Sequence, residues 1–120
     1  MEYQISEKNN RQYIEVVDGS QKLASEQEAL DLVAICGEHR LPRLMIHAEN
    51  LTEDFYHLST GVAGAILQKF VNYQIRVAAV LPPEKASQGK FGEMVLESNR
   101  GNQFRVYSTR GEAEDWLTRA

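Results

Sequence analysis

The stretch that most constrains the fold spans residues 44–81, where two apolar runs flank a loop and an amphipathic segment. The first run, residues 44–46, lacks alternation of apolar and polar side chains, which is typical of a central strand covered on both faces. The second run, residues 75–81, is halted by the two prolines that follow it. Between the runs, apolar residues at helical spacing occupy residues 62–71. The stretch therefore predicts a strand–loop–helix–strand unit.

Two features before this unit extend the pattern. β-prone runs at residues 3–5 and 13–17, separated by a polar stretch with paired asparagines, predict an N-terminal antiparallel hairpin. A capping box then begins at Ser25, with Glu28 three residues later, and predicts a helix that Pro42 prevents from continuing. The chain therefore alternates strands and helices from its beginning.

The C-terminal third continues this alternation. Helical spacing predicts a helix within residues 84–99, a β-prone run predicts a strand at residues 104–107, and a capping box from Thr109 to Glu112 predicts a terminal helix. Residues 1–120 are thus expected to form a single α/β domain. Its mostly parallel sheet should have about five strands, with the hairpin as its antiparallel part, and about four helices.

Charge and composition exclude several classes of protein. The chain has 13 basic and 17 acidic residues, a net charge of −4, and scattered basic positions, so we expect no nucleic-acid partner. We also expect no membrane span, because no apolar window approaches about 18 residues. The N-terminus lacks a basic flank and an apolar core, so the protein should be cytoplasmic. The single cysteine, Cys36, should be a buried small hydrophobe.

Polar residues gather after the first central strand: His47, Glu49, Asn50, Asp54 and His57. They lack the spacing of known histidine metal motifs, so we expect neither a metal nor a cofactor. His47 is the strongest single candidate, because the carboxyl end of a strand is where sites form in open α/β sheets. It could act as a base or orient a ligand, or it could be a hydrogen-bonded structural histidine.

The helix start at Ser59, Thr60 and Gly61 also allows two interpretations. A hydroxyl could cap the helix, while small residues such as Gly64 let the helix lie close to the sheet. Alternatively, the free N–H groups could bind an anion, or a hydroxyl could be phosphorylated. The sequence has no nucleotide P-loop, dinucleotide fingerprint or nucleophile elbow. Without a complete catalytic set, we expect binding rather than catalysis.

Several strings resemble an uncharacterised bacterial family of single-domain proteins, a domain of unknown function. They are the residues H-A-E-N-L from His47, D-F-Y-H-L-S-T-G-V-A-G from Asp54, Q-K-F-V-N-Y from Gln68 and E-S-N-R-G from Glu97. The resemblance covers nearly the whole chain and names no activity.

The order of elements is also distantly similar to the STAS domain of anti-anti-sigma factors. In that family a strand leads to an Asp-Ser-Ser-Gly turn and a helix, and a partner kinase phosphorylates the first serine. Here residues 58–61 occupy that place, with Leu58 instead of the acidic residue. The resemblance implies a STAS-like fold, a regulatory role and Ser59 as the candidate phosphoacceptor.

These observations favour a cytoplasmic regulatory or protein-interaction module with an unidentified protein partner. Its expected interaction surface comprises His47, Asn50, Ser59, Thr60, Gly61 and Gly64. The alternative is a small ligand-binding protein or enzyme that uses His47 and the Thr60-Gly61 helix start for an anionic ligand. A third interpretation, assembly into a homo-oligomer through an open edge of the hairpin, also stays open.

Overall fold

The computed structural model describes residues 1–119 and contains a five-stranded sheet in the order β1-β2-β3-β4-β5. The strands are β1 (Tyr3–Lys8), β2 (Arg11–Val16), β3 (Arg43–His47), β4 (Arg76–Val80) and β5 (Phe104–Tyr107). The β1–β2 pair is antiparallel and the other three pairs are parallel. The predicted α/β class, mostly parallel sheet and N-terminal hairpin are therefore confirmed, with β3 at the centre.

Four main helices accompany this sheet: α1 (Glu26–His39), α3 (Val62–Asn72), α5 (Gly89–Ser98) and α6 (Arg110–Leu117). Shorter turns connect them: η1 (Ala48–Asn50), α2 (Glu53–Tyr56), η2 (Leu58–Thr60) and α4 (Pro83–Ala86). In the described part of the chain, every helix is too short or too polar to cross a membrane.

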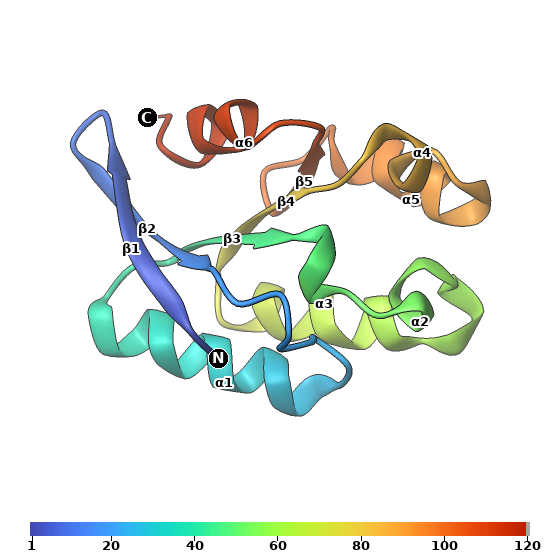
Figure 1. The fold of residues 1–120 in the computed structure, drawn as a ribbon, viewed down its shortest axis with the longest axis horizontal. Coiled ribbons are helices and arrows are strands. Elements are labelled where there is room, and N and C mark those ends of the chain that lie inside the picture. The colour runs from blue at the N-terminus through green and yellow to red at the C-terminus, as the bar shows by residue number, and fades with distance from the viewer. Residues whose placement is uncertain (120) are drawn as a thin grey trace.

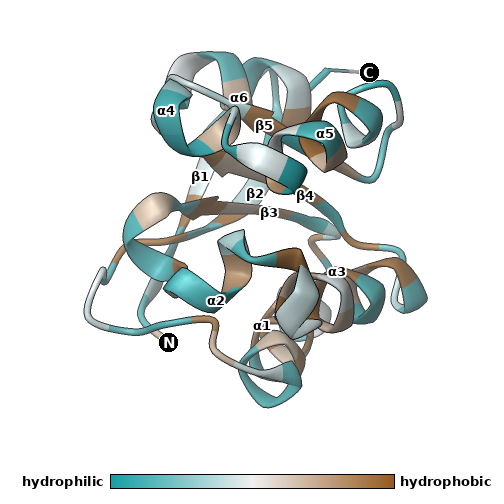
Figure 2. Cartoon of the chain, turned by 90° about the vertical axis from the view of Figure 1, so that its right-hand side faces the viewer, coloured by the Kyte–Doolittle hydropathy of each residue, from teal (hydrophilic) through white to brown (hydrophobic). Residues whose placement is uncertain are grey.

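The helices form layers on the two faces of the sheet (Figures 1 and 2). Helices α1 and α3 lie side by side on one face, and α6 lies on the other. Alternate strand residues supply the two cores, because successive side chains point to opposite faces. Ile14, Leu44 and Val77 belong to the larger core under α1 and α3. Tyr13 and Met45 join the smaller core under α6.

The N-terminal hairpin turns more tightly than the sequence predicted. Asn9 and Asn10 adopt positive φ angles of 56° and 62°, so a two-residue turn joins strands that extend beyond the predicted runs. Positive φ at both central positions is typical of a type I′ turn, which asparagine tolerates better than most residues. The hairpin register places Gln4 opposite Glu15, which becomes important at the candidate site.

Ser25 and Thr109 cap α1 and α6 as predicted, but the carboxylates of Glu28 and Glu112 accept from the cap hydroxyls and not from the cap backbone, so the capping boxes are not reciprocal. The Ser25 hydroxyl accepts a hydrogen bond from the backbone of Gln27 at 3.2 Å, and the Thr109 hydroxyl accepts one from Glu112 at 3.3 Å. The thiol of Cys36 is buried in the core beneath α1, and burial raises its pKa to about 12. This agrees with the expected role of Cys36 as a small hydrophobe.

The predicted helix at residues 84–99 is two helices, α4 and α5. The break allows the backbone of Ser87 to approach Gly92 so closely that a Cβ atom on this glycine would lie 2.7 Å from the Ser87 carbonyl oxygen. A glycine that weakens a helix in isolation is therefore required by the close contact at this bend.

Candidate functional site

A buried carboxylate organises the face of the sheet beneath α6. Glu15 of β2 is 4% exposed, and the Nε2 atom of His47 on β3 lies 2.8 Å from its Oε2 atom. Both residues fall on the α6 face, because they continue the alternation that places Tyr13 and Met45 there. The candidate histidine therefore already has a partner on the neighbouring strand.

Helix α6 supplies the opposite charge. The guanidinium of Arg110 donates to both Glu15 oxygens, with Nη2 at 2.7 Å from Oε1 and Nε at 2.9 Å from Oε2. Nη2 also lies 3.0 Å from the hydroxyl of Tyr13, which donates to Glu114 at 2.6 Å. A planar guanidinium suits this bidentate arrangement.

The β1 strand completes the set of hydrogen bonds. Gln4 and Ser6 donate to Oε1 of Glu15 at 3.1 Å and 3.2 Å. We call these residues the Glu15 cluster: Gln4, Ser6, Tyr13, Glu15, His47, Arg110 and Glu114. The cluster ties β1, β2, β3 and α6 together and satisfies the buried carboxylate from several directions, as a buried charge requires.

The electrostatics of the cluster favour an ionised carboxylate. Burial opposes ionisation of Glu15, but hydrogen bonds from His47, Arg110 and Gln4 outweigh burial and hold its pKa well below its ordinary value. The hydrogen bonds to Glu15 raise the pKa of Arg110. Burial, followed by the hydrogen bond to Glu114, raises the pKa of Tyr13. The cluster therefore holds a fixed carboxylate–guanidinium pair.

Asn50 fastens a loop next to this cluster. Its Oδ1 atom accepts from the His47 backbone at 3.0 Å, and its Nδ2 atom donates to the carbonyls of Asp18 and Gln21 at 3.0 Å and 3.3 Å. The residue is 1% exposed, so its side chain shapes the loop and is not itself accessible surface. A hollow of about 250 Å³ lies here, bordered by Glu15, His47, Asn50 and their neighbours.

The second candidate region, residues 58–64, is called the Ser59 segment below. The Thr60 hydroxyl lies 2.8 Å from the carbonyls of Asp54 and His57 and accepts from the Val62 backbone at 3.2 Å. The N-cap of α3 is Gly61, which has no side chain to cap the helix, and the Thr60 hydroxyl joins the preceding turns to the first residue of α3. Among the hydrogen bonds within residues 1–119, the neighbouring Ser59 hydroxyl takes no part, and Ser59 is exposed.

Neither glycine of this segment lets α3 pack closely against the sheet. Gly61 has a φ of 79°, a left-handed conformation that favours glycine and lets the chain turn from η2 into α3. Gly64 is exposed, and a Cβ atom placed on it would have no neighbouring atom within 4 Å. The expectation that Gly64 lets the helix approach the sheet is therefore wrong, because the buried face of α3 carries Ala63, Ile66 and Phe70.

A cavity of about 430 Å³ adjoins the Ser59 segment. Ser59 and His57 line one side, and Gly89 and Lys90 at the start of α5 line the other. His47 and Asn50 border a different hollow. The structure thus brings His47 and Asn50 together, and it places Ser59 in a separate recess with Lys90.

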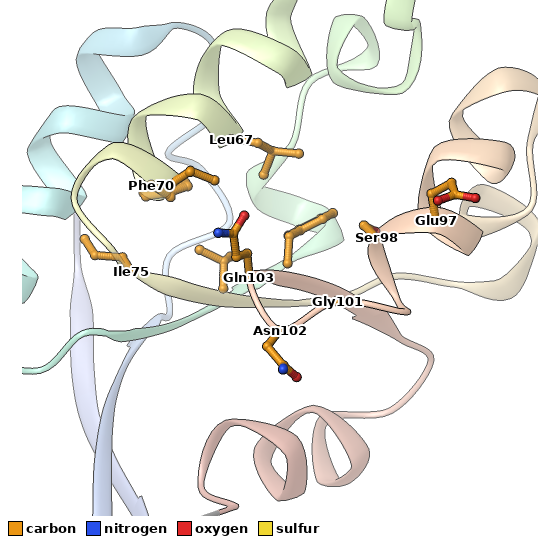
Figure 3. A pocket seen from close by; sticks show the side chains of 11 residues that line it. Leu67, Phe70, Ile75, Glu97, Ser98, Gly101, Asn102 and Gln103 are labelled. Atoms are coloured by element: carbon orange, nitrogen blue, oxygen red, sulfur yellow. The ribbon is translucent and has the colours of Figure 1, made fainter.

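An apolar groove of about 530 Å³ was not anticipated from the sequence. It lies between the end of α3, the end of α5 and the start of β5, with Leu67, Phe70 and Ile75 on one side and Glu97 and Ser98 on the other (Figure 3). Its lining comes from segments distant in sequence, so no local pattern could predict it.

Sequence reasoning also missed Glu15 and Arg110. The signal for Glu15 was a single carboxylate within the apolar run at residues 13–17, a position where an unpaired charge would be costly. The partner was not deducible, because Arg110 is 95 residues away. Among residues 1–119, no group of three or more His, Cys, Asp or Glu side chains is placed to hold a metal ion.

Among the comparisons with known proteins, only a family model matches the chain. No curated protein and no solved structure matches the chain. A family model matches residues 8–117, which include the Glu15 cluster from Tyr13 onward and the whole Ser59 segment. The chain therefore belongs to the family defined by the domain of unknown function DUF4180.

Proposed function

We propose that this protein is a cytoplasmic regulatory module that binds a protein partner through the Ser59 segment. The proposal is based on the contrast between the hydroxyls of Ser59 and Thr60. The Thr60 hydroxyl is hydrogen-bonded to backbone groups on both sides of it, whereas the exposed hydroxyl of Ser59 makes no hydrogen bond within residues 1–119. The Ser59 hydroxyl is therefore accessible to a partner protein.

The distant similarity to STAS domains supports the regulatory part of the proposal. The resemblance implies Ser59 as the phosphoacceptor, and Ser59 lies in the turn η2, after α2 and before α3. A phosphate would add roughly −1.5 to −2 charge at this surface. It would lie near the start of α3, where the helix dipole favours negative charge, and in a recess that Lys90 also lines. Phosphorylation would therefore change the charge of the surface without opposing the fold.

The experiment is affinity capture from native lysate with three variants. Ser59→Asp introduces negative charge, Ser59→Ala removes the hydroxyl, and Gln12→Glu adds a charge to an exposed position on the hairpin as a control. We expect Ser59→Asp to change the set of captured proteins relative to wild type and Gln12→Glu to leave it unchanged. Intact-mass analysis of the recovered wild-type protein should show a phosphate adduct. Identical capture by all variants would eliminate the switch.

Ligand binding at His47 is the second candidate. The observation in its favour is the hollow of about 250 Å³ beside the contact between His47 and Glu15. Glu15 and Glu49 also border this hollow, so its charge opposes the anionic ligand expected from the sequence. Native mass spectrometry of the purified protein distinguishes the candidates. A retained small molecule that is lost in His47→Gln would favour ligand binding over the interaction module.

A further inference from the structure

Four arginines gather on the α6 face of the sheet, around the amino ends of its parallel strands. Arg11, Arg43 and Arg76 lie at the first positions of β2, β3 and β4, and Arg105 is the second residue of β5. We call this group the Arg43 patch. It lies at the opposite end of the parallel strands from the loops that lead to the Ser59 segment, so it is a separate surface.

Register and contacts place these side chains together. Arg43 and Arg76 are direct partners in the parallel β3–β4 pair, where neighbouring strands are about 4.8 Å apart. Arg76 and Arg105 both lie over the ring of Trp116 on α6, at 5.4 Å and 5.2 Å from its centroid. Arg11 precedes Tyr13 by two residues and so shares its face.

The arginines of the patch have no ion-pair partner within residues 1–119. All ion pairs there involve other basic residues, and none joins a carboxylate to Arg11, Arg43, Arg76 or Arg105. Each of the four side chains is only partly exposed. Burial, together with the charges of Arg11 and Arg76, lowers the pKa of Arg43. The patch therefore carries mutual repulsion that a bound anion would relieve.

The Arg43 patch is positively charged, whereas the rest of the chain has an excess of acidic residues. Four of the 13 basic residues lie in it, which leaves nine basic residues against 17 acidic residues elsewhere. A long polyanion such as duplex DNA would extend over this acidic remainder and be repelled. The ring of Trp116 is 4% exposed, so it is not available to stack on a nucleic-acid base. A short acidic segment, which covers only the patch, avoids both obstacles.

We infer that the Arg43 patch binds an acidic segment of a protein partner through its carboxylates. Guanidinium groups suit this role because they can grip carboxylates with two parallel hydrogen bonds. The inference does not depend on the Ser59 segment, since the two surfaces lie at opposite ends of the parallel strands.

The single tryptophan provides the probe, because Trp116 contacts two arginines of the patch. Hexaglutamate peptide is titrated into the wild-type protein while tryptophan fluorescence is recorded. We expect a saturable change that weakens when salt rises from about 20 mM to about 300 mM, where screening is stronger. The double variant Arg11→Gln/Arg43→Gln keeps both tryptophan contacts and should bind the peptide at least about tenfold more weakly.

The matched control is Arg100→Gln, which removes an exposed arginine that pairs with Glu97 on α5. This variant should bind the peptide as the wild type does. The inference is overturned if hexaglutamate gives no saturable change, or if Arg11→Gln/Arg43→Gln binds it as tightly as Arg100→Gln. Tighter binding of a short DNA duplex than of hexaglutamate would also overturn the assignment to an acidic protein segment. Circular dichroism of each variant verifies that it is folded.

Discussion

The Glu15 cluster and the Ser59 segment both contain polar residues near the carboxyl ends of strands, yet they differ in how those residues are used. In the cluster, the buried carboxylate accepts hydrogen bonds from His47, Arg110 and residues of β1. In the segment, Ser59 is exposed and makes no hydrogen bond with any described residue. A histidine at a strand end can therefore serve the fold, while a less conspicuous serine is left accessible.

The largest expected effect comes from breaking the cluster at its centre. Glu15→Gln removes the negative charge and leaves Arg110 without its partner. We expect the free energy of unfolding to fall by about 2–3 kcal/mol, near the lower end for broken buried ion pairs because Arg110 is half exposed. Urea denaturation measures this loss. Glu7→Gln, on the exposed side of β1, is the control and should change stability by less than about 0.5 kcal/mol.

The stability cost of Glu15→Gln should depend on pH. Because the pKa of Glu15 is lowered on folding, its contribution is fully present above its ordinary value of 4.5 and is lost as pH falls toward the lower folded value. The stability difference between wild type and Glu15→Gln should therefore shrink between pH 5 and pH 3. Denaturation curves at both pH values give this difference. An unchanged difference would mean that the network does not favour the ionised carboxylate.

A smaller effect is expected within the Ser59 segment at Thr60. Thr60→Val keeps the shape of the side chain but removes the hydroxyl that accepts from the Val62 backbone. The free energy of unfolding should fall by about 1 kcal/mol, as is typical for loss of an intramolecular hydrogen bond. Thermal denaturation of Thr60→Val beside wild type measures the change, and equal stability would show that these hydrogen bonds do not stabilise the fold.

The smallest effect is expected at the preceding residue, Ser59. Ser59→Ala removes a hydroxyl that makes no hydrogen bond in the described structure, so stability should stay within about 0.5 kcal/mol of wild type. The pair Ser59→Ala and Thr60→Val is therefore a matched test of two adjacent hydroxyls. A loss at Ser59 as large as that at Thr60 would contradict the distinction between them.

Local sequence patterns predicted most of the fold, because its helices and strands depend on residues that are close together in the sequence. The caps at Ser25 and Thr109 and the apolar periodicity of α3 are properties of a few neighbouring residues. The break between α4 and α5 was missed because it depends on how closely the Ser87 backbone approaches Gly92. A distance of this kind is set by packing and leaves no periodic signal.

The candidate sites were less predictable than the fold. His47 and Asn50 stood out by residue type and position, but the partner that decides the role of His47 is Glu15, 32 residues earlier. The Arg43 patch combines residues from four strands that are adjacent only after the sheet has formed. Whether a polar residue belongs to a structural network or to an accessible surface depends on its contacts with residues distant in sequence, and its residue type does not reveal these contacts.

We propose that His47 serves the fold and that Ser59 serves partner binding. The most direct measurement compares partner capture by Ser59→Asp and His47→Gln, each verified as folded by circular dichroism and used at equal concentration. We expect that Ser59→Asp changes the captured proteins while folded His47→Gln captures the same set as wild type. The opposite pattern, with capture altered by His47→Gln and unaffected by Ser59→Asp, would contradict it.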